Sequence, residues 1–243
     1  MDKKHALLLA FLITTLIAGN YFFFVEAGVS RESVEITRVL DGDTVELDDG
    51  RKVRLANINT PEKGLAYSEL ARNYLEEFVG KNLEMENLGG DKYGRTLGRL
   101  YFDDKYINLE IVRQGFAHTY LVFEDEEREF ARAEEYAHDR ELGIWESPEY
   151  ADCISATINK YDEYVVVYDS CDLDLKEWTI KDESTKTYRI DEDAGSELTI
   201  YSGEGEDSTN VRYWGKKKIW NDDKDRIFIR DSSGLLVFYD SYS

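Results

Sequence analysis

Residues 34–55, VEITRVLDGDTVELDDGRKVRL, alternate apolar and polar side chains in three short runs. Alternation at a period of two is typical of β-strands that bury one face. The sequences DGD at 41–43 and DDG at 48–50 separate the runs, and glycine and aspartate favour tight turns between strands. The stretch therefore predicts a three-strand meander that begins a small β-barrel, with its third strand running on to Ile58.

The chain after the meander alternates between helical and strand-like patterns. Apolar residues at helical spacing predict a helix over 65–78, and Gly80 follows where a glycine cap is favoured. Beyond it the patterns predict strands at 83–88 and 97–102, a polar loop at 89–95, a short helix from 107 to 115 and a charged helix at 124–142. Short strands with helices between them predict an OB-fold β-barrel of the α+β class over residues 28–149.

Residues 150–243 have a different character. Their β-rich runs are separated by polar turns and lie at 164–168, 178–180, 198–201, 226–230 and 235–239. Many short strands without a long helix predict an all-β sandwich. We therefore expect a multidomain protein, and its two prolines, Pro61 and Pro148, leave no proline-rich linker.

The N-terminus combines a basic flank with an apolar run. Lys3 and Lys4 precede residues 6–25, a run of the length that spans a bilayer. The residues before Gly28 also fit a signal-peptidase site. Residues 1–27 are thus predicted to be a signal peptide or a membrane anchor. Either alternative places the remaining chain outside the cell, secreted or tethered at the surface.

The net charge of −21 at pH 7 is spread over both halves of the chain. Nucleic acids are normally bound by Lys and Arg side chains that neutralise phosphates, so the overall field opposes such binding. Nucleic-acid chemistry must then depend on a local cluster of cations or on a bound metal ion. The remaining acidic surface is interpreted as one that keeps the protein hydrated and soluble.

The cysteines and histidines limit the kinds of site that the chain can form. In an exported protein Cys153 and Cys171 could pair in a disulfide, and two separate thiols are the alternative. The histidines, His5, His118 and His138, are scattered. That scatter argues against a histidine-based metal site and against a Ser-His-Asp triad.

Polar residues gather at the ends of the predicted meander strands. Asp41 and Asp43 occupy a strand boundary, and Asn59, Thr60 and Glu62 follow the third strand. We expect the two segments to meet at one rim of the barrel, where carboxylate, amide and carbonyl oxygens would suit Ca²⁺. Positive charge for a substrate phosphate is supplied by Arg54, Lys92 and Arg95.

This set of residues fits hydrolysis of a phosphodiester, which needs an activated water, neutralised phosphate charge and alignment. Glu62 is predicted to orient or deprotonate the water. Arg54 and Arg95 are predicted to hold the equatorial phosphate oxygens. Loss of one such stabilising group typically raises the barrier by about 3–4 kcal/mol.

Four ordered motifs resemble the staphylococcal nuclease (thermonuclease) family. They are VLDGDTV at 39–45, the stretch from RL to NTPE over 54–62, DKYGR at 91–95 and VRQG at 112–115, and IW at 144–145 follows them. Each motif alone is weak, but their order and spacing together are specific. The resemblance implies an OB-fold endonuclease that binds Ca²⁺ and hydrolyses DNA and RNA to 3′-phosphate ends.

Position by position, the resemblance implies roles for the rim residues. Asp43 is implied as the main carboxylate ligand of the metal, the carbonyl of Thr60 as another ligand, and Asp41 as a carboxylate behind them. Tyr93 and Tyr120 are implied to pack near the nucleotide.

Asn59 departs from the family, which usually has an aspartate there. Asparagine keeps an oxygen donor but loses a charge, so Ca²⁺ affinity should fall or the metal preference should change. Two other interpretations stay open: a catalytically silent OB-fold module that binds nucleic acid or a protein, and a surface adhesion protein. The set of Arg54, Glu62 and Arg95 argues against both, because binding alone needs no water-orienting carboxylate beside two phosphate clamps.

The C-terminal region resembles a lamin-tail domain, an Ig-like sandwich appended to some nucleases. The resemblance depends on EYVVV at 163–167, DLKEWTI at 174–180 and IWNDDKDRIF at 219–228. It implies a targeting or binding role without chemistry of its own. Trp178 and Trp220 are expected in the core of this domain.

Overall fold

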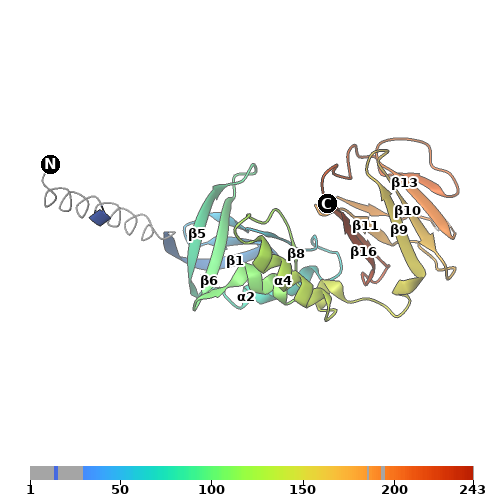
Figure 1. Ribbon diagram of the computed structural model, residues 1–243. Helices are drawn as coiled ribbons and strands as arrows, with labels where there is room; N and C mark the ends of the chain where they lie inside the picture. The colour runs from blue at the N-terminus through green and yellow to red at the C-terminus, as the bar shows by residue number, and fades with distance from the viewer. Residues whose placement is uncertain (1–13, 16–29, 185, 193–194, 243) are drawn as a thin grey trace, which may run out of the picture.

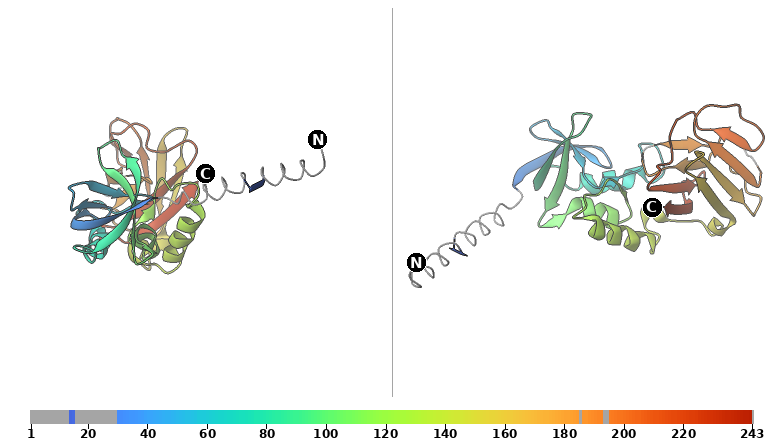
Figure 2. Two further views of the ribbon diagram at one scale, coloured as in Figure 1. Left: turned by 90° about the vertical axis from the view of Figure 1, so that its left-hand side faces the viewer. Right: turned by 45° about the horizontal axis from the view of Figure 1, so that its top comes forward.

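The computed structural model describes residues 14–15, 30–184, 186–192 and 195–242. A body of strands and helices comes first, and an all-strand body lies beside it (Figures 1 and 2). The predicted signal peptide or anchor at 1–27 lies outside the described residues, apart from Thr14 and Thr15. Among the described residues, no helix has the length and apolar character needed to cross a membrane.

A closed β-barrel forms the first body. Its main sheet has six strands in the order β3-β2-β1-β5-β6-β7. The strands are β1 (Arg31–Asp41), β2 (Thr44–Leu47), β3 (Lys52–Leu55), β5 (Asn82–Gly90), β6 (Thr96–Phe102) and β7 (Lys105–Tyr106). A further parallel pairing of β3 with β6, with Val53 beside Thr96, closes the sheet on itself. The predicted OB-like barrel, opened by a meander, is confirmed.

The alternation within the first strand sets which side chains enter the barrel. Val34, Ile36 and Val39 are buried, whereas Glu35 and Arg38 are exposed. A register shift between Ile36 and Arg38 returns Val39 to the inside, although it is three residues beyond Ile36. The buried side chains of the strands and helices then form one continuous core.

The third strand ends at Leu55 and does not run on to Ile58 as predicted. Asn57 takes a left-handed backbone conformation (φ 69°) in the turn that follows, a conformation that asparagine tolerates better than most residues. The chain then forms β4 (Ile58–Asn59), which pairs with β8 (His118–Thr119). This turn takes Asn59 and the residues after it away from the barrel wall.

The first body also contains the helices α2 (Ser68–Glu76), α3 (Ile107–Arg113) and α4 (Glu127–His138), and the 3-10 turn η1 (Gly143–Trp145). Two helices are shorter than the predicted spans 65–78 and 124–142. Tyr67, just before α2, and Glu141, after α4, have left-handed backbones that a helix does not accommodate.

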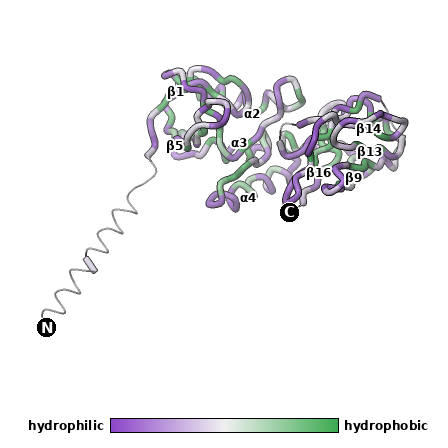
Figure 3. The backbone as a smooth tube through the Cα atoms, turned by 90° about the horizontal axis from the view of Figure 1, so that it is seen from above, coloured by the Kyte–Doolittle hydropathy of each residue, from purple (hydrophilic) through white to green (hydrophobic). Residues whose placement is uncertain are grey.

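Two four-stranded sheets form the second body, in the orders β14-β13-β10-β9 and β12-β11-β15-β16. The strands are β9 (Ile154–Asn159), β10 (Tyr164–Asp169), β11 (Thr179–Lys181), β12 (Thr187–Arg189), β13 (Glu197–Tyr201), β14 (Val211–Tyr213), β15 (Asp225–Arg230) and β16 (Leu236–Tyr242). Both sheets contribute to one apolar core, in which Trp178 and Trp220 are buried as expected. The all-β character is confirmed, and the Ig-like topology stays a prediction. Figure 3 shows apolar segments inside the two bodies and polar segments along their outer surface.

A disulfide joins Cys153 and Cys171, whose Cα atoms are 5.6 Å apart. Cys153 ends the 3-10 turn η2 (Ala151–Cys153), where the chain enters the second body. Cys171 follows β10, the strand that pairs with β9. The predicted pairing is therefore present. It links the start of the second body to the sheet that contains β9 and β10.

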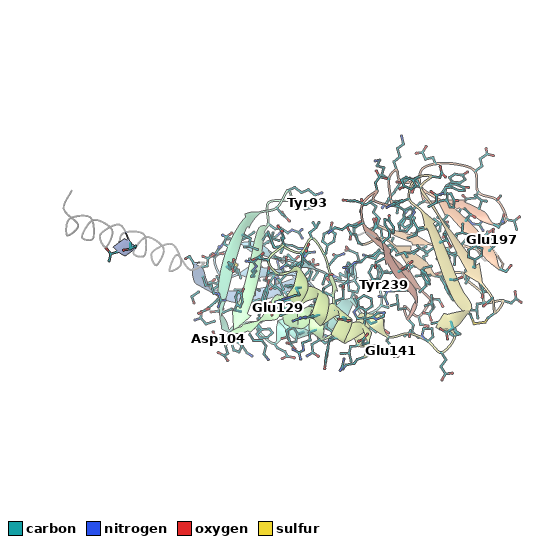
Figure 4. The ribbon with its side chains drawn as sticks, in the orientation of Figure 1. Tyr93, Asp104, Glu129, Glu141, Glu197 and Tyr239 are labelled. Atoms are coloured by element: carbon teal, nitrogen blue, oxygen red, sulfur yellow. A yellow bond between two sulfur atoms is a disulfide. The ribbon has the colours of Figure 1, made fainter. Side chains whose placement is uncertain are left out.

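The two bodies share a buried interface. Its apolar cluster combines Ala137, Ile144 and Trp145 of the first body with Phe228 and Leu236 of the second. Tyr239 packs edge-on against Trp145, with 5.1 Å between the ring centroids, and Figure 4 shows Tyr239 where the bodies meet.

Polar contacts fix the same interface. The Arg226 guanidinium of the second body donates to both carboxylate oxygens of buried Glu134, at 2.9 Å each. Gly234 approaches the first body so closely that a Cβ there would lie 2.0 Å from the Cβ of Ala66. The second body is therefore packed against the barrel by specific contacts.

Candidate active site

The rim begins where the turn between β1 and β2 meets the segment after β4. A Cβ on Gly42 would lie 2.8 Å from Oγ1 of Thr60, so this position requires glycine for close approach. The backbone N–H of Thr60 donates to the Asp43 carboxylate at 3.4 Å. The predicted meeting of residues 41–43 with residues 59–62 is confirmed.

Asp43 is the buried centre of the rim, with 7% of its surface exposed. Its Oδ2 lies 3.0 Å from Nη2 of Arg54, and its Oδ1 accepts a hydrogen bond from Oγ1 of Thr44 at 3.0 Å. Burial raises the pKa of Asp43 to about 6, the Arg54 charge opposes that rise, and the nearby Asp41 carboxylate adds to it. Asp43 is thus a carboxylate whose negative charge Arg54 only partly compensates.

Arg54 holds the end of its own strand as well as Asp43. Its guanidinium donates to the carbonyl oxygens of Leu55 (2.6 Å) and Ile58 (2.9 Å), and lies 3.4 Å from Oδ1 of Asn59. These bonds fix the turn that takes the chain from β3 to β4. A phosphate at Arg54 would have to use the N–H of Nε, the second N–H of Nη1, or replace one of these acceptors.

Arg95 reaches the same cluster from the loop between β5 and β6. Its Nε donates to Asp91 at 2.8 Å, and its Nη1 donates to Oγ1 of Thr44 at 3.4 Å. Because Thr44 also contacts Asp43, this threonine joins the second arginine to the buried carboxylate. The structure thereby brings Asp43, Arg54 and Arg95 together.

The same loop presents a tyrosine and a lysine to solvent. Tyr93 is 72% exposed, and Figure 4 shows it near the tip of this loop. Nζ of Lys92 and the guanidinium of Arg95 lie 5.1 Å and 5.5 Å from the centre of the Tyr93 ring. An exposed ring flanked by two cations is suited to stacking on a base while the cations face phosphates.

Glu62 differs from the other rim residues because it is exposed and its carboxylate forms no hydrogen bond or ion pair with the described residues, while its backbone carbonyl accepts from Leu65 N–H at 3.0 Å. It follows Thr60, which is fixed to Asp43 through its N–H and its hydroxyl. A carboxylate at this place is free to accept a proton from a water molecule.

Asn59 connects the rim to the second body. Its side chain is buried, and its Nδ2 donates to the carbonyl of Ser184 at 3.3 Å and lies 3.4 Å from Nε2 of His118. Nζ of Lys181 lies 3.2 Å from the same Nε2 atom. The sequence analysis did not anticipate these contacts, since only the packing of the two bodies brings Lys181 and Ser184 beside the barrel.

His118 serves as the acceptor in that group. Its Nδ1 lies 3.0 Å from the Thr119 carbonyl, which can only accept, so the proton belongs on Nδ1 and Nε2 accepts from its neighbours. Burial, then the Lys181 charge, hold the pKa of His118 well below its usual value. The ring is therefore neutral and serves as a hydrogen-bond acceptor for the side chains of Asn59 and Lys181.

Tyr120 lies half-buried between the rim and the turn after β11. Burial raises its pKa, as do the charges of Glu183 and Asp182 in that turn, whereas the charges of Arg54 and Lys92 lower it. The side chain is thus near both the predicted phosphate clamps and the second body.

The oxygen atoms at the rim are of the chemical types that bind a hard cation. Within the described residues no three side chains of His, Cys, Asp or Glu form a metal-binding group. Any cation would be held by the carboxylate of Asp43 with neutral oxygens from Thr60 and Asn59, and Asp41, which accepts a hydrogen bond from the Asp43 N–H at 3.1 Å, would lie behind them. The raised pKa of Asp43 shows a carboxylate charge that a cation would stabilise, and such oxygen donors suit Ca²⁺.

The barrel and its rim agree with the predicted class, a small-barrel nuclease, and comparisons with known proteins agree as well. The family described as staphylococcal nuclease homologue matches residues 52–147. An uncharacterized endonuclease of Haemophilus influenzae is 35% identical over 141 residues, which cover 55% of this chain and 77% of that protein.

Two further relatives carry more specific names. The micrococcal nuclease of Shigella flexneri is 32% identical over 128 residues, covering 47% of this chain and 74% of the relative. The thermonuclease of Staphylococcus intermedius is 30% identical over 132 residues, covering 49% and 79%. The chain therefore belongs to the staphylococcal nuclease family, and the prediction of a nuclease-type enzyme is confirmed at the level of family.

Proposed function

We propose that this protein is a Ca²⁺-dependent endonuclease that hydrolyses phosphodiester bonds of DNA, RNA or both at the barrel rim. The observation that carries the proposal is the cluster of Asp43, Arg54, Thr44 and Arg95, with an unpartnered Glu62 two residues beyond Thr60. A buried acidic oxygen, two guanidinium groups and a free carboxylate are the components that phosphodiester hydrolysis requires.

In the proposed reaction the chain's own residues hold the phosphate and move one proton. Arg95 and Arg54 direct N–H groups at the equatorial phosphate oxygens and stabilise the charge that develops on them. Glu62 accepts a proton from the attacking water, whose oxygen forms the new bond to phosphorus. The bond from phosphorus to the 5′ oxygen breaks, and that oxygen takes a proton from solvent, which leaves a 3′-phosphate and a 5′-hydroxyl.

Ca²⁺ would be held by Asp43, the Thr60 carbonyl and the Asn59 amide oxygen, with Asp41 behind them, and when bound it supplies positive charge beside the scissile phosphate. The side chain of Asn59 has one neighbour that donates a hydrogen bond and another that accepts one. Its oxygen is 3.4 Å from Arg54, whereas its nitrogen donates toward Ser184 of the second body. Asparagine suits both neighbours, because one end of the amide accepts and the other donates.

For the remaining parts of the chain we propose the roles that the sequence suggested. Residues 150–243 would act in targeting or binding, as the resemblance to a lamin-tail domain implies. Residues 1–27 would export the protein or anchor it at the cell surface, as their basic flank and apolar run suggest.

The test compares cleavage of plasmid DNA and of RNA by the full chain in Ca²⁺ and in EGTA. We expect cutting in Ca²⁺ only, and Glu62→Gln should lower kcat by about two to three decades, as loss of one transition-state contact typically does. Glu77→Gln is the matched control. It changes an exposed carboxylate that directly follows the end of α2. Cleavage that persists in EGTA or in Glu62→Gln would contradict the proposal. Binding without cleavage would favour the silent OB-fold module.

A further inference from the structure

A pocket of about 380 Å³ lies between the two bodies, next to the candidate active site. The first body lines it with Pro61 and with Gly64 to Ala66, the loop that follows Glu62, and the second body lines it mainly from β11, β12 and the β15–β16 turn. The pocket therefore exists only because the second body is packed against the barrel.

Cations outnumber carboxylates in the lining of this pocket, whereas the protein as a whole is acidic. In a chain of net charge −21, the lining includes the cations Lys181, Arg189 and Arg230 and the carboxylates Glu177 and Asp231. Both carboxylates already have partners, Glu177 within the pocket lining and Asp231 beside it. Glu177 forms an ion pair with Arg189, and Asp231 accepts hydrogen bonds from the Tyr150 hydroxyl (2.5 Å) and from the backbone of its own turn.

Lys181 and Arg230 are left without a carboxylate partner among the described residues. Nζ of Lys181 contacts only the His118 ring (3.2 Å) and the Asp182 carbonyl (3.0 Å), and Nη1 of Arg230 donates to the Gly234 carbonyl at 3.1 Å. Burial lowers the pKa of Lys181 to about 8 and that of Arg230 to about 10. The charges of Asp182, Glu62 and Asp225 act on Lys181 and that of Asp231 acts on Arg230, but none of them forms an ion pair with these cations. Two partly desolvated cations without a direct ion pair are stabilised by an anion that enters the space beside them.

A third polar group at the pocket also lacks a partner. Oγ1 of Thr187, on β12, is buried and makes no hydrogen bond to any described residue. Buried hydroxyls are normally hydrogen-bonded, and an exception needs an explanation. A ligand oxygen in the pocket would provide that explanation.

We propose that the interdomain pocket binds a phosphate group of the nucleic-acid strand, on a nucleotide beyond the one being cleaved. This inference rests on the proposed nuclease function and extends it, because it makes the second body part of substrate binding. Guanidinium, ammonium and hydroxyl donors together suit a phosphate. The pocket is lined by Pro61 and by Gly64 to Ala66, which flank Glu62 in the chain, so one strand can pass from the rim to the pocket.

The test measures how substrate length affects KM. The double variant Lys181→Met/Arg230→Met is compared with the wild type on a ten-nucleotide single strand and on a dinucleotide that has one phosphodiester. We expect the KM of the ten-nucleotide strand to rise by about tenfold or more relative to that of the dinucleotide, since each lost charged hydrogen bond weakens binding by about tenfold. The exposed pair Lys216→Met/Lys217→Met removes the same charge outside the pocket and should leave the ratio unchanged.

Thr187→Val gives a second variant that keeps the shape of the pocket and both cations. It should raise the same KM ratio by roughly threefold, because it removes only a neutral hydrogen bond. Circular dichroism melting of each variant shows whether it folds. An unchanged KM ratio in a folded double variant would overturn the proposal.

A binding measurement separates this inference from the nuclease proposal. The Kd of the ten-nucleotide strand is measured with Glu62→Gln as the parent protein, with and without the double substitution, and again in competition with inorganic phosphate. A Kd that rises only in the double variant supports the pocket even if the wild type proves not to cut. A pocket that binds inorganic phosphate while the Kd of the strand stays unchanged would mean a site for free phosphate and would refute our assignment.

Discussion

Cations at the barrel rim and cations in the interdomain pocket differ in what neutralises them. At the rim, Arg54 is paired with Asp43 and Arg95 with Asp91. In the pocket, Lys181 and Arg230 contact only neutral groups among the described residues. A paired arginine mainly organises the groups around it, whereas a desolvated cation without a counter-ion is ready to receive an anion.

This difference assigns separate tasks to the two regions. The rim arginines are held in place before substrate arrives, as a site that stabilises a transition state requires. Each still has an N–H group without a partner in the described part of the chain, Nε in Arg54 and Nη2 in Arg95. The pocket instead contributes affinity, and the two regions together let an acidic protein hold a polyanion.

The largest effect is expected from breaking the rim pair with Arg54→Met. The Asp43 carboxylate would remain buried without its counter-charge, so the free energy of unfolding should fall by about 3–5 kcal/mol, and cleavage should fall below detection. Urea unfolding in EGTA measures the first quantity, and plasmid cleavage in Ca²⁺ measures the second.

Two variants control this experiment. Adding Asp43→Asn to Arg54→Met removes both charges and should recover part of the free energy of unfolding. Replacing both partners destabilises a protein less than leaving one charged partner buried and unpaired. Arg38→Met breaks an exposed pair with Glu46 and should change stability by less than about 1 kcal/mol. Equal losses of free energy of unfolding for Arg54→Met and Arg38→Met would show that the pair of Arg54 and Asp43 does not organise the barrel.

The rim was predictable because its residues lie within short local motifs. The period-two pattern gave the strand 44–47 with its correct bounds and the start of the next strand at Lys52, but the end predicted at Ile58 was wrong. Asp43, Arg54, Thr60 and Arg95 meet at the rim beside these strands. What the pattern could not show was the left-handed turn at Asn57, because an asparagine, although uncommon in strands, does not by itself fix the residue at which a strand ends.

The pocket could not be predicted from the sequence, for a physical reason. Its lining residues are separated by more than a hundred residues in the chain, as with Pro61 and Lys181, and meet only through packing between two independent cores. The strands β12 and β14 were missed, and their three residues each carry little periodicity, although β11, of the same length, was predicted at 178–180. Strand β9 was also missed, although Ile154–Asn159 alternates apolar and polar residues.

A moderate effect is expected when the interface that builds the pocket is overpacked. In Gly234→Ala the new Cβ would lie 2.0 Å from the Cβ of Ala66, and the backbone there has φ +90°. The free energy of unfolding should fall by about 1–3 kcal/mol, and the KM ratio between long and short strands should rise as the pocket opens. Urea unfolding and steady-state cleavage measure these two changes.

Gly203→Ala is the matched control for the interface. Gly203 has a similar backbone (φ +84°), but no atom lies within 4 Å of a Cβ built there. The control therefore carries the backbone strain without the clash. If both substitutions destabilise the protein equally, the close approach of the two bodies is not what requires glycine at 234.

The smallest effect should come from Asn59→Asp, the position where rim and second body meet. An aspartate would place a carboxylate oxygen against the Ser184 carbonyl and the lone pair of His118 Nε2, where the amide nitrogen now donates. In EGTA the free energy of unfolding should fall by about 1 kcal/mol, while the added charge should tighten Ca²⁺ binding in a calorimetric titration. Asn87→Asp, on the exposed part of β5, controls for the charge alone. Tighter Ca²⁺ binding with a loss of stability would mean that asparagine serves the packing of the second body at the expense of the metal. Unchanged Ca²⁺ affinity would remove position 59 from the metal site and leave it as an interface residue only.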